Sequence, residues 1–195
     1  KKEKKIEAAI QETAGEVIYY EDELISAMFF STSNGQTETA QNYSGTDIPY
    51  LQSVESRGEE DLATAYKEEV KMPLAKWNAA FGSEWSADMF QSLQLVRNSS
   101  GRVQKVVTAG FEKEGRAVRE LLGLRSTDFN IAFDVTNELV LINTVGYGHG
   151  VGMSQYGAEA LAQEGSTAYD IIAHYYTGTS VEKILINDPT CLKTP

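Results

Sequence analysis

The fold is decided by two alternating stretches, Phe129-Asn-Ile-Ala-Phe-Asp-Val135 and Leu139-Val-Leu-Ile-Asn-Thr144, which surround the turn residues Thr136 and Asn137. Apolar side chains recur at every second position, which is the period of a β-strand with one buried face. The short polar link between the stretches is typical of a hairpin. We therefore expect two antiparallel strands over residues 129–144.

Short helices and further strands are predicted on both sides of this hairpin. Most helical stretches are followed by a glycine, which suits the left-handed conformation after a helix, and Thr167 and Asp170 form a capping-box pair. The expected helices cover residues 3–13, 73–81, 115–122, 154–163 and 167–176. The expected strands cover residues 16–20, 24–30, 50–54 and two runs within 90–109 around a turn at 98–101. Because the elements lack regular βαβ spacing, we predict an α+β fold with a mixed, mainly antiparallel sheet and short helices.

Two polar segments lack the apolar periodicity of helices and strands. Residues 31–47 are expected to form a surface loop or a short helix. Residues 55–71 contain the acidic runs 59–61 and 68–69, which we interpret as a solvated face, and a linker is expected here if the chain has one. We divide the chain into an N-terminal portion, residues 1–54, and a C-terminal portion, residues 55–195, within one compact unit.

The composition indicates a globular protein with its own hydrophobic core. Of the 195 residues, 42% are hydrophobic and 23% are charged, which argues against intrinsic disorder. The 17 Lys and Arg against 28 Asp and Glu give a net charge of −11, which repels a nucleic-acid backbone or an anionic membrane. We expect no nucleic-acid partner, and the charge favours a neutral ligand or a basic surface on a partner protein.

Cysteine content and the N-terminus set further limits. Cys191 is the single cysteine, so a disulfide within the chain and a zinc site of several cysteines are excluded. No stretch approaches the roughly 18 apolar residues of a membrane span, and no signal peptide follows the lysine-rich start. The first residue is not Met, and we interpret the chain as a portion of a longer protein.

The glycine segment Gly146-Tyr-Gly-His-Gly-Val-Gly152 is the most informative motif. On an extended backbone its glycines would leave one face without side chains, so that another group can approach closely. That group is either a ligand or a neighbouring segment of the core, and the pattern favours neither. The segment is not a dinucleotide fingerprint, a P-loop or a nucleophile elbow, because the glycine spacings differ and no P-loop lysine follows.

Two further groups of polar residues have both a structural and a functional interpretation. Ser31-Thr-Ser-Asn-Gly-Gln-Thr37 supplies hydroxyls and amides that bind sugars well, but such residues more often form turns and caps. His149 lies among glycines, whereas His174 has the position of a hydrogen-bonded residue at the edge of the core. The two histidines lack the spacing of metal ligands, so we expect no metal site and no cofactor.

Several stretches together resemble one protein family. The chain contains, in this order, Gly146-Tyr-Gly-His-Gly-Val-Gly-Met-Ser-Gln-Tyr-Gly-Ala158, Ala160-Leu-Ala-Gln-Glu-Gly165 and Ile172-Ala-His-Tyr-Tyr-Thr-Gly178. This order is similar to the C-terminal signature of the stage II sporulation protein D and amidase-enhancer family. Residues 29–38, 48–54 and 115–126 resemble the same family, so that the resemblance covers essentially the whole chain.

The resemblance implies a role in peptidoglycan processing during engulfment of the forespore in endospore-forming bacteria. Members of the sporulation branch are lytic transglycosylases, lyases that act on glycan strands after an amidase has removed the stem peptides. They form 1,6-anhydro-N-acetylmuramic ends without water. In the family a glutamic acid protonates the glycosidic oxygen, which requires that its pKa is raised.

The family acid is absent from its expected position in this sequence. In other members of the family this glutamic acid lies in an Ala-Ser-Glu-Met-Pro-like run before the Ser-Thr-Ser segment. No Ser-Glu-Met-Pro occurs in this sequence. We therefore assign no catalytic residue and expect the acid upstream of this chain, because neither Glu38 nor Glu55 matches it. The resemblance implies a substrate-groove role for these residues: Ser31, Thr32, Ser33, Gly35, Thr37, His149, Met153, Ser154, Gln155, His174 and Tyr175.

The resemblance also implies partners and a location. The partners are peptide-free glycan strands, the cell-wall amidase stage II sporulation protein P and a membrane scaffold. The location is extracytoplasmic, on a membrane-anchored protein in the septal space between mother cell and forespore. The alternative function is a non-catalytic module that binds glycan and recruits or stimulates a cell-wall amidase.

Overall fold

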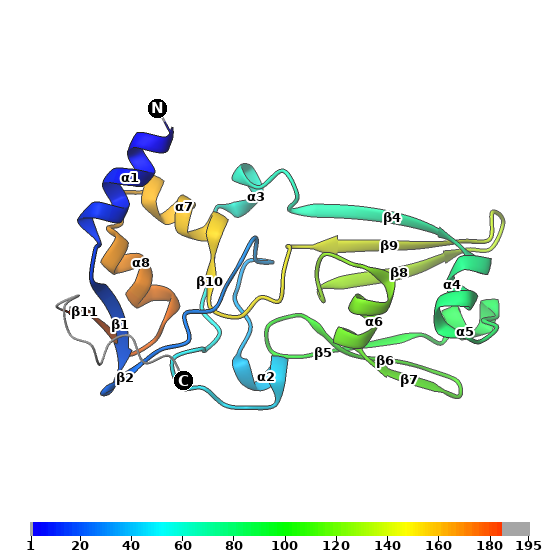
Figure 1. Cartoon of the computed structure of the whole chain (residues 1–195). Helices are drawn as coiled ribbons and strands as arrows, with labels where there is room; N and C mark the ends of the chain where they lie inside the picture. Colours follow the sequence, from blue (N-terminus) through cyan, green and yellow to red (C-terminus); the bar gives the residue numbers. More distant parts are fainter. Residues whose placement is uncertain (1, 185–195) are drawn as a thin grey trace. The chain divides into compact units, whose positions relative to one another are not determined.

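A computed structural model describes residues 2–184 of the chain (Figure 1). Within this range the helices are short and three of the four sheets are antiparallel, which confirms the predicted α+β class. The described residues form two units, 2–27 with 178–184 and 28–177. The division predicted after residue 54 lies at neither boundary and stays a prediction. Cys191 lies outside the described residues.

The first unit contains one helix and a small sheet. α1 (Lys2–Glu12) ends before Gly15, which has a left-handed φ of 81°. The sheet has the order β11 (Thr179–Lys183), β1 (Glu16–Tyr20) and β2 (Glu23–Leu24). The helix and the β1–β2 hairpin confirm the prediction, but the strand predicted over residues 24–30 is not continuous, since residues 25–28 belong to no strand, and β11 was missed. No helix among residues 2–184 is both long and apolar enough for a bilayer, since the longest has 11 residues.

Two three-stranded antiparallel sheets form one half of the second unit (Figure 1). The first has the order β4 (Lys67–Pro73), β9 (Leu139–Val145) and β8 (Phe129–Asp134). The second has the order β5 (Gln94–Arg97), β6 (Val103–Thr108) and β7 (Phe111–Glu114). β8 and β9 are the predicted hairpin, with Phe133 opposite Val140, and β5 and β6 are the two predicted runs within 90–109.

Apolar side chains from both sheets and the adjoining helices form one core. The helices are α4 (Leu74–Phe81), α5 (Ala87–Gln91) and α6 (Gly115–Leu122). Trp77 and Trp85 are buried in this core, with ring centroids 5.1 Å apart and planes at 82°. α4 and α6 confirm the prediction and end at left-handed glycines, whereas α5 was not predicted.

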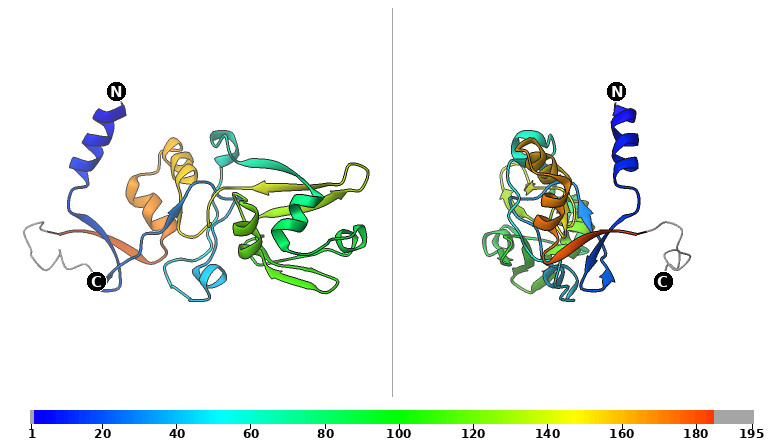
Figure 2. Two further views of the ribbon diagram at one scale, coloured as in Figure 1. Left: turned by 45° about the vertical axis from the view of Figure 1, so that its right-hand side comes forward. Right: turned by 90° about the vertical axis from the view of Figure 1, so that its left-hand side faces the viewer.

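The other half of the second unit consists of short elements joined by loops. They are β3 (Phe29–Phe30), α2 (Ala40–Ser44), α3 (Glu59–Leu62), β10 (Met153–Ser154), α7 (Gln155–Gln163) and α8 (Ala168–Tyr175). β10 runs parallel to β3, and α7 and α8 lie side by side in both views (Figures 1 and 2). The predicted helices 154–163 and 167–176 are confirmed. The capping box is also confirmed, because Thr167 and Asp170 exchange hydrogen bonds.

The predictions for residues 31–71 are confirmed only in part. The segment 31–47 forms a loop and the short helix α2, as predicted, and residues 44–47 are exposed, but the segment does not lie wholly on the surface, since Thr32, Ser33, Thr37 and Glu38 are buried. Residues 50–54 form no strand, and residues 55–71 are not a linker because they contain α3 and the start of β4. Polar side chains, rather than an apolar stripe, hold this segment inside the protein, so its burial leaves no apolar periodicity in the sequence.

Candidate functional site

The glycines of residues 146–152 lie against another segment of the same chain. Gly146, Gly148, Gly150 and Gly152 have φ values between 80° and 115°, which glycine adopts without strain. A Cβ atom at Gly146, Gly148 or Gly152 would lie 2.0–2.8 Å from atoms of residues 28–33. Of the two interpretations left open by the sequence, the structure therefore supports packing within the protein.

Hydrogen bonds join the glycine segment to the Ser31–Thr37 segment. The Thr32 N–H donates to the carbonyl of Tyr147 at 3.0 Å, and the Tyr147 N–H donates back to the Thr32 carbonyl at 2.7 Å. The Met153 N–H donates to the carbonyl of Met28 at 3.1 Å. The two motifs that the sequence singled out thus lie side by side in one region.

The buried carboxylate of Glu59 connects these two motifs. Its side chain accepts two hydrogen bonds from Ser33, from the hydroxyl at 2.5 Å and from the backbone N–H at 2.8 Å. The hydroxyls of Ser56 and Ser154 donate to it at 2.6 Å each. Each carboxylate oxygen accepts two of these four bonds, which is the full capacity of the group. We call Ser33, Ser56, Glu59, Ser154 and Tyr175 the Glu59 network.

Tyr175 extends the network to α8. Its hydroxyl lies 2.6 Å from the Ser56 hydroxyl, and burial raises the pKa of Tyr175 to about 12, so the phenol is neutral. Gly157 leaves room for this contact, since a Cβ there would lie 2.1 Å from the Tyr175 hydroxyl. The network therefore fixes α3, α7, α8 and the Ser33 loop against one another.

The position of Glu59 corrects the interpretation of the acidic run. Residues 59–61 were predicted to form a solvated face, and Glu60 and Asp61 are exposed, but Glu59 is only 2% exposed. A run of charges is usually solvated. The residues around Glu59 in the sequence give no sign that this one carboxylate of the run binds the hydroxyls of Ser33 and Ser154, which lie 26 and 95 positions away.

Glu38 is a second buried carboxylate in this half of the unit. One oxygen accepts from the Thr39 N–H and the Asn42 amide, both at 2.9 Å. The other accepts from the Asn98 amide at 2.7 Å and the Ser100 hydroxyl at 2.8 Å. A general acid must present its proton to the substrate at hydrogen-bond distance. Four donors already occupy the oxygens of Glu38, as they do at Glu59, so neither carboxylate is free for that role.

A cavity of about 200 Å³ lies beside Glu38 and the glycine segment. Its volume is below the roughly 300–1,000 Å³ of whole small-molecule sites, so it suits one part of a larger ligand. The ring of Tyr43 lies 5.5 Å from the His149 ring and 4.3 Å from the guanidinium carbon of Arg116. We call this space the His149 cavity, and its lining includes Glu38, Asn42, Tyr43, Arg102, Arg116 and His149.

The His149 ring is held by backbone groups of the glycine segment and of β3. Its Nδ1 accepts a hydrogen bond from the Val151 N–H at 3.0 Å, and the ring also hydrogen-bonds the backbone of Phe29. Burial lowers the pKa of His149, and the nearby arginine charges lower it further. The ring is therefore neutral at neutral pH. It contributes an aromatic face to the cavity wall and does not act as a proton donor.

Acidification is expected to destabilise the protein through His149. Its pKa is lower in the folded chain than the value of about 6.5 for the unfolded chain, so the unfolded state takes up a proton first as the pH falls. The free energy of unfolding therefore has its full value above about pH 6.5 and decreases as the pH falls below that value. Urea unfolding between about pH 7 and pH 5 checks this, and the loss should be smaller in His149→Gln. Parallel pH curves for the two proteins would contradict it.

The remaining predicted residues lie in several places. Ser31 and Gly35 flank the buried part of their loop, and Thr37 is buried with its hydroxyl donating to the Gln52 carbonyl at 3.2 Å. Met153 lies in β10 opposite Phe29. The contacts with glycan proposed for these residues, and for Thr32, Ser33, Ser154 and Tyr175, stay predictions. In the structure the side chains of the last four are buried.

Gln155 and His174 are exposed and lie apart from the His149 cavity lining. Gln155 begins α7 and lines a hollow of about 470 Å³ together with Tyr156. His174 lies with Nε2 at 2.6 Å from the Glu55 carbonyl, which agrees with the expected hydrogen-bonded residue at the edge of the core. Sequence reasoning singled out neither Glu59 nor Arg102, although both are buried charged residues of this region.

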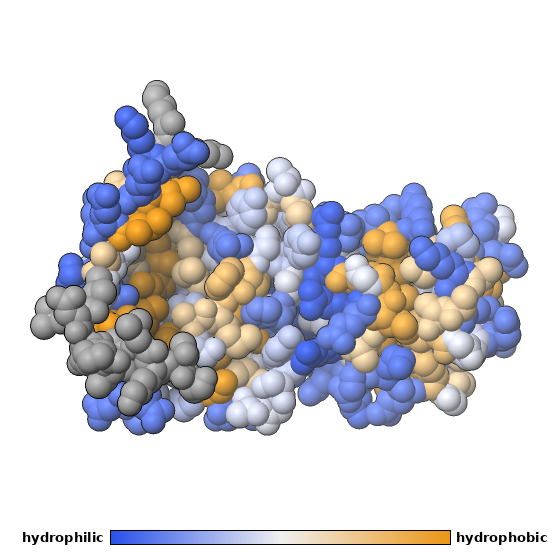
Figure 3. All heavy atoms as spheres, in the orientation of Figure 1, coloured by the Kyte–Doolittle hydropathy of each residue, from blue (hydrophilic) through white to orange (hydrophobic). Residues whose placement is uncertain are grey.

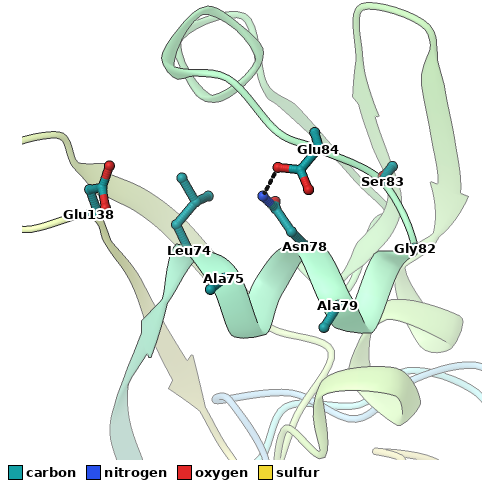
Figure 4. Close-up of a pocket in the computed structure, with 8 residues that line it drawn as sticks. All are labelled: Leu74, Ala75, Asn78, Ala79, Gly82, Ser83, Glu84 and Glu138. Carbon is teal, nitrogen blue, oxygen red and sulfur yellow. Dashed lines mark hydrogen bonds between the residues drawn. The ribbon is translucent and has the colours of Figure 1, made fainter.

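Another hollow belongs to a different part of the unit. It measures about 590 Å³ beside α4 and is lined in part by Ala75, Ala79 and Glu138. Figure 4 shows Asn78 and Glu84 facing one another there, joined by a hydrogen bond of 2.7 Å. None of its lining residues comes from the two motifs. Among residues 2–184 no three His, Cys, Asp or Glu side chains are grouped as a metal site.

Comparison with known proteins identifies relatives of the chain, although no protein-family model matches it. The chain is 37% identical over 92% of its length to stage II sporulation protein D of Bacillus subtilis (strain 168), and equally to that of Bacillus amyloliquefaciens. It spans about half, 52%, of the length of both. The amidase enhancer of B. subtilis is 24% identical over 89% of the chain and 32% of its own length. The predicted resemblance is therefore confirmed, and the chain is a sequence relative of stage II sporulation protein D.

Proposed function

We propose that the chain is part of a sporulation cell-wall protein that cleaves peptide-free glycan strands of peptidoglycan. The reaction is that of a lytic transglycosylase, which forms 1,6-anhydro-N-acetylmuramic ends. The observation that carries the proposal is the 37% identity to stage II sporulation protein D over 92% of the chain. The His149 cavity, next to the glycine motif, adds ring faces and polar groups suited to an amino sugar.

The proton in this reaction is proposed to come from outside residues 1–195. The acid protonates the glycosidic oxygen, and the bond from this oxygen to the anomeric carbon of the muramic residue breaks. The muramic 6-hydroxyl oxygen bonds to that carbon and gives its proton to the carboxylate that the acid has become, so that neither water nor a second carboxylate nucleophile is needed. The sequence lacks the Ser-Glu-Met-Pro run, and the oxygens of Glu38 and Glu59 are occupied by four donors each. The chain then contributes substrate binding.

Product analysis tests the proposal. This chain and a version extended upstream are each incubated with peptide-free glycan, and the products are analysed by mass spectrometry. We expect 1,6-anhydro ends from the extended protein only. Anhydro products from the chain alone would contradict the location of the acid, and their absence with both proteins would contradict the transglycosylase function.

A second candidate function is a non-catalytic module that binds glycan and stimulates a cell-wall amidase. The similarity to the amidase enhancer favours it. The discriminating result is faster release of stem peptides by purified amidase when the chain is added, together with no anhydro products from the extended protein.

The resemblance alone supports the proposed location and partners. The protein would act outside the cytoplasm, anchored to the cell membrane, in the septal space between mother cell and forespore. Its partners would be the amidase stage II sporulation protein P and a membrane scaffold. A fluorescent fusion of the longer protein that spreads evenly around the cell would contradict this location.

A further inference from the structure

Arginines gather around the His149 cavity although the chain as a whole is acidic, with a net charge of −11. Where β8 begins and β9 ends, a band of hydrophilic side chains crosses the face drawn in Figure 3. The colours of Figure 3 do not distinguish positive from negative side chains, so the local field is inferred from the positions of the arginines. Four of the six arginines of the chain lie in its lining or next to the glycine motif: Arg102, Arg116, Arg119 and Arg125.

Arg102 gives the strongest reason to expect a ligand. The residue is 2% exposed, and Nη2 donates to the Gln36 carbonyl at 3.0 Å. Nε and Nη1 have no hydrogen-bond partner among the described residues. Gly150 allows the guanidinium to pack closely, since a Cβ there would lie 2.7 Å from Nη2. Buried charged donors without acceptors are costly and rare. We therefore expect a ligand to supply the hydrogen-bond acceptor that Nε and Nη1 lack.

The two carboxylates that line the cavity do not supply this partner. Glu38 accepts all four of its hydrogen bonds from other groups, and Glu114 is exposed. Within residues 2–184, no ion pair joins Arg102 to either of them. Glu38 offsets part of the buried positive charge at a distance, but the unpaired nitrogens still need a hydrogen-bond acceptor.

A carboxylate is the acceptor that suits a guanidinium best, because charge-assisted hydrogen bonds to it are short and strong. The muramic residues of peptidoglycan carry such a group. In an intact strand the lactyl carboxyl is bound to the stem peptide as an amide, and hydrolysis of that amide frees a charged carboxylate. A peptide-free strand therefore presents one carboxylate on each muramic residue, and a lactyl group is a substituent of the size that the cavity admits.

We propose that Arg102 and Arg116, in the His149 cavity, bind the free lactyl carboxylate of one muramic residue. Through this contact the protein distinguishes peptide-free strands from strands that still carry stem peptides. The inference rests on the proposed function, since it takes glycan as the substrate, and it adds the group that is recognised and the residues that recognise it. An amide at the same place has no charge, and a stem peptide attached to it is larger than the cavity of about 200 Å³.

The first test compares two strands that differ only at the lactyl group. The chain is titrated with soluble peptide-free glycan and with the same glycan after its carboxylates have been converted to primary amides. We expect the conversion to weaken binding about 10- to 100-fold, the loss of one or two charge-assisted hydrogen bonds. Equal affinities would overturn this inference but leave glycan as the substrate. Binding to neither glycan would contradict the proposed function itself.

Variants of the arginines provide the second test. Arg116→Gln should weaken binding of the carboxylate strand about 5- to 10-fold and leave binding of the amide strand unchanged. Arg57→Gln is the matched control, because Arg57 is 79% exposed and pairs with Glu55 outside the cavity lining, and it should change neither affinity. Equal losses for Arg116→Gln and Arg57→Gln would overturn the inference.

Arg102→Lys tests the buried guanidinium directly. It keeps the positive charge and removes the planar donors, so it should reduce the preference for the carboxylate strand. Thermal unfolding first establishes that this variant is folded. A folded Arg102→Lys protein that prefers the carboxylate strand as strongly as the wild type would overturn the role of Arg102. If the variant does not fold, the comparison of the two strands and the affinities of Arg116→Gln decide the inference.

Discussion

Replacing Glu59 by alanine is expected to lower the free energy of unfolding by about 3–5 kcal/mol. The substitution removes four hydrogen bonds and leaves the buried donors of Ser33, Ser56 and Ser154 without their acceptor. Glu59→Gln keeps the size of the side chain but turns one acceptor into a donor, so we expect a loss of about 2–3 kcal/mol. Urea unfolding followed by tryptophan fluorescence measures both, because both tryptophans are buried in this unit.

Glu60→Ala is the matched control for this prediction. Glu60 is the next residue of the same short helix but is exposed, so its removal should change the free energy of unfolding by less than about 0.5 kcal/mol. If Glu59→Ala is as stable as Glu60→Ala, the Glu59 network does not hold this half of the unit together. If Glu59→Gln is as stable as the wild type but the extended protein carrying it no longer cleaves glycan, Glu59 acts in catalysis instead.

Gly152→Ala is expected to lower the free energy of unfolding by about 2–5 kcal/mol. The φ of Gly152 is 80°, and a non-glycine residue in this region costs about 1–2 kcal/mol. In addition, its Cβ would lie 2.0 Å from the backbone oxygen of Met28, which must move and thereby disturb the pairing of β10 with β3. Overpacking of this kind costs about 1–3 kcal/mol. The same urea experiment measures the sum.

Gly165→Ala separates the two causes. Gly165 also has a positive φ, 99°, but no atom lies within 4 Å of a Cβ at this position. We therefore expect a loss of about 1–2 kcal/mol, the conformational part alone. Equal losses at Gly152 and Gly165 would show that the close approach of residues 28–33 to the glycine motif does not contribute to stability.

Local signals in the sequence were sufficient for most helices and hairpins. The β8–β9 hairpin follows from alternation over adjacent residues, and the start of α8 follows from Thr167 and Asp170, three positions apart. Each of these features depends on neighbours in the chain. β11 was missed because its partner β1 lies far away in the sequence and its own five residues carry no clear alternation.

The candidate site depends on contacts between distant residues, and the sequence revealed them only in part. The glycine pattern predicted a close approach but not its partner, since residues 28–33 precede the motif by more than 100 positions. Ser56 and Tyr175, 119 positions apart, contact one another beside Glu59, which looks in the sequence like one charge of a solvated run. The family resemblance drew attention to Ser33, Ser154 and Tyr175, but only the structure shows that Ser33 and Ser154 share this carboxylate and that Tyr175 reaches it through Ser56.

Arg102 was missed for a related reason. It lies between the turn at 98–101 and β6, where a single arginine is ordinarily a surface residue. Its burial results from the approach of Gly150 and Gln36, which no local pattern records. Buried charged residues of this kind are the features that sequence patterns describe least well.

The central claim is that peptide-free glycan binds at the His149 cavity. An NMR titration of the isotope-labelled chain with a soluble peptide-free glycan fragment tests it most directly. The account predicts saturable shifts of backbone amides at Tyr43, Arg102, Arg116 and His149, with Tyr156 in the hollow beside α7 unchanged. Shifts concentrated at Tyr156, with none at the residues of the His149 cavity, would contradict it.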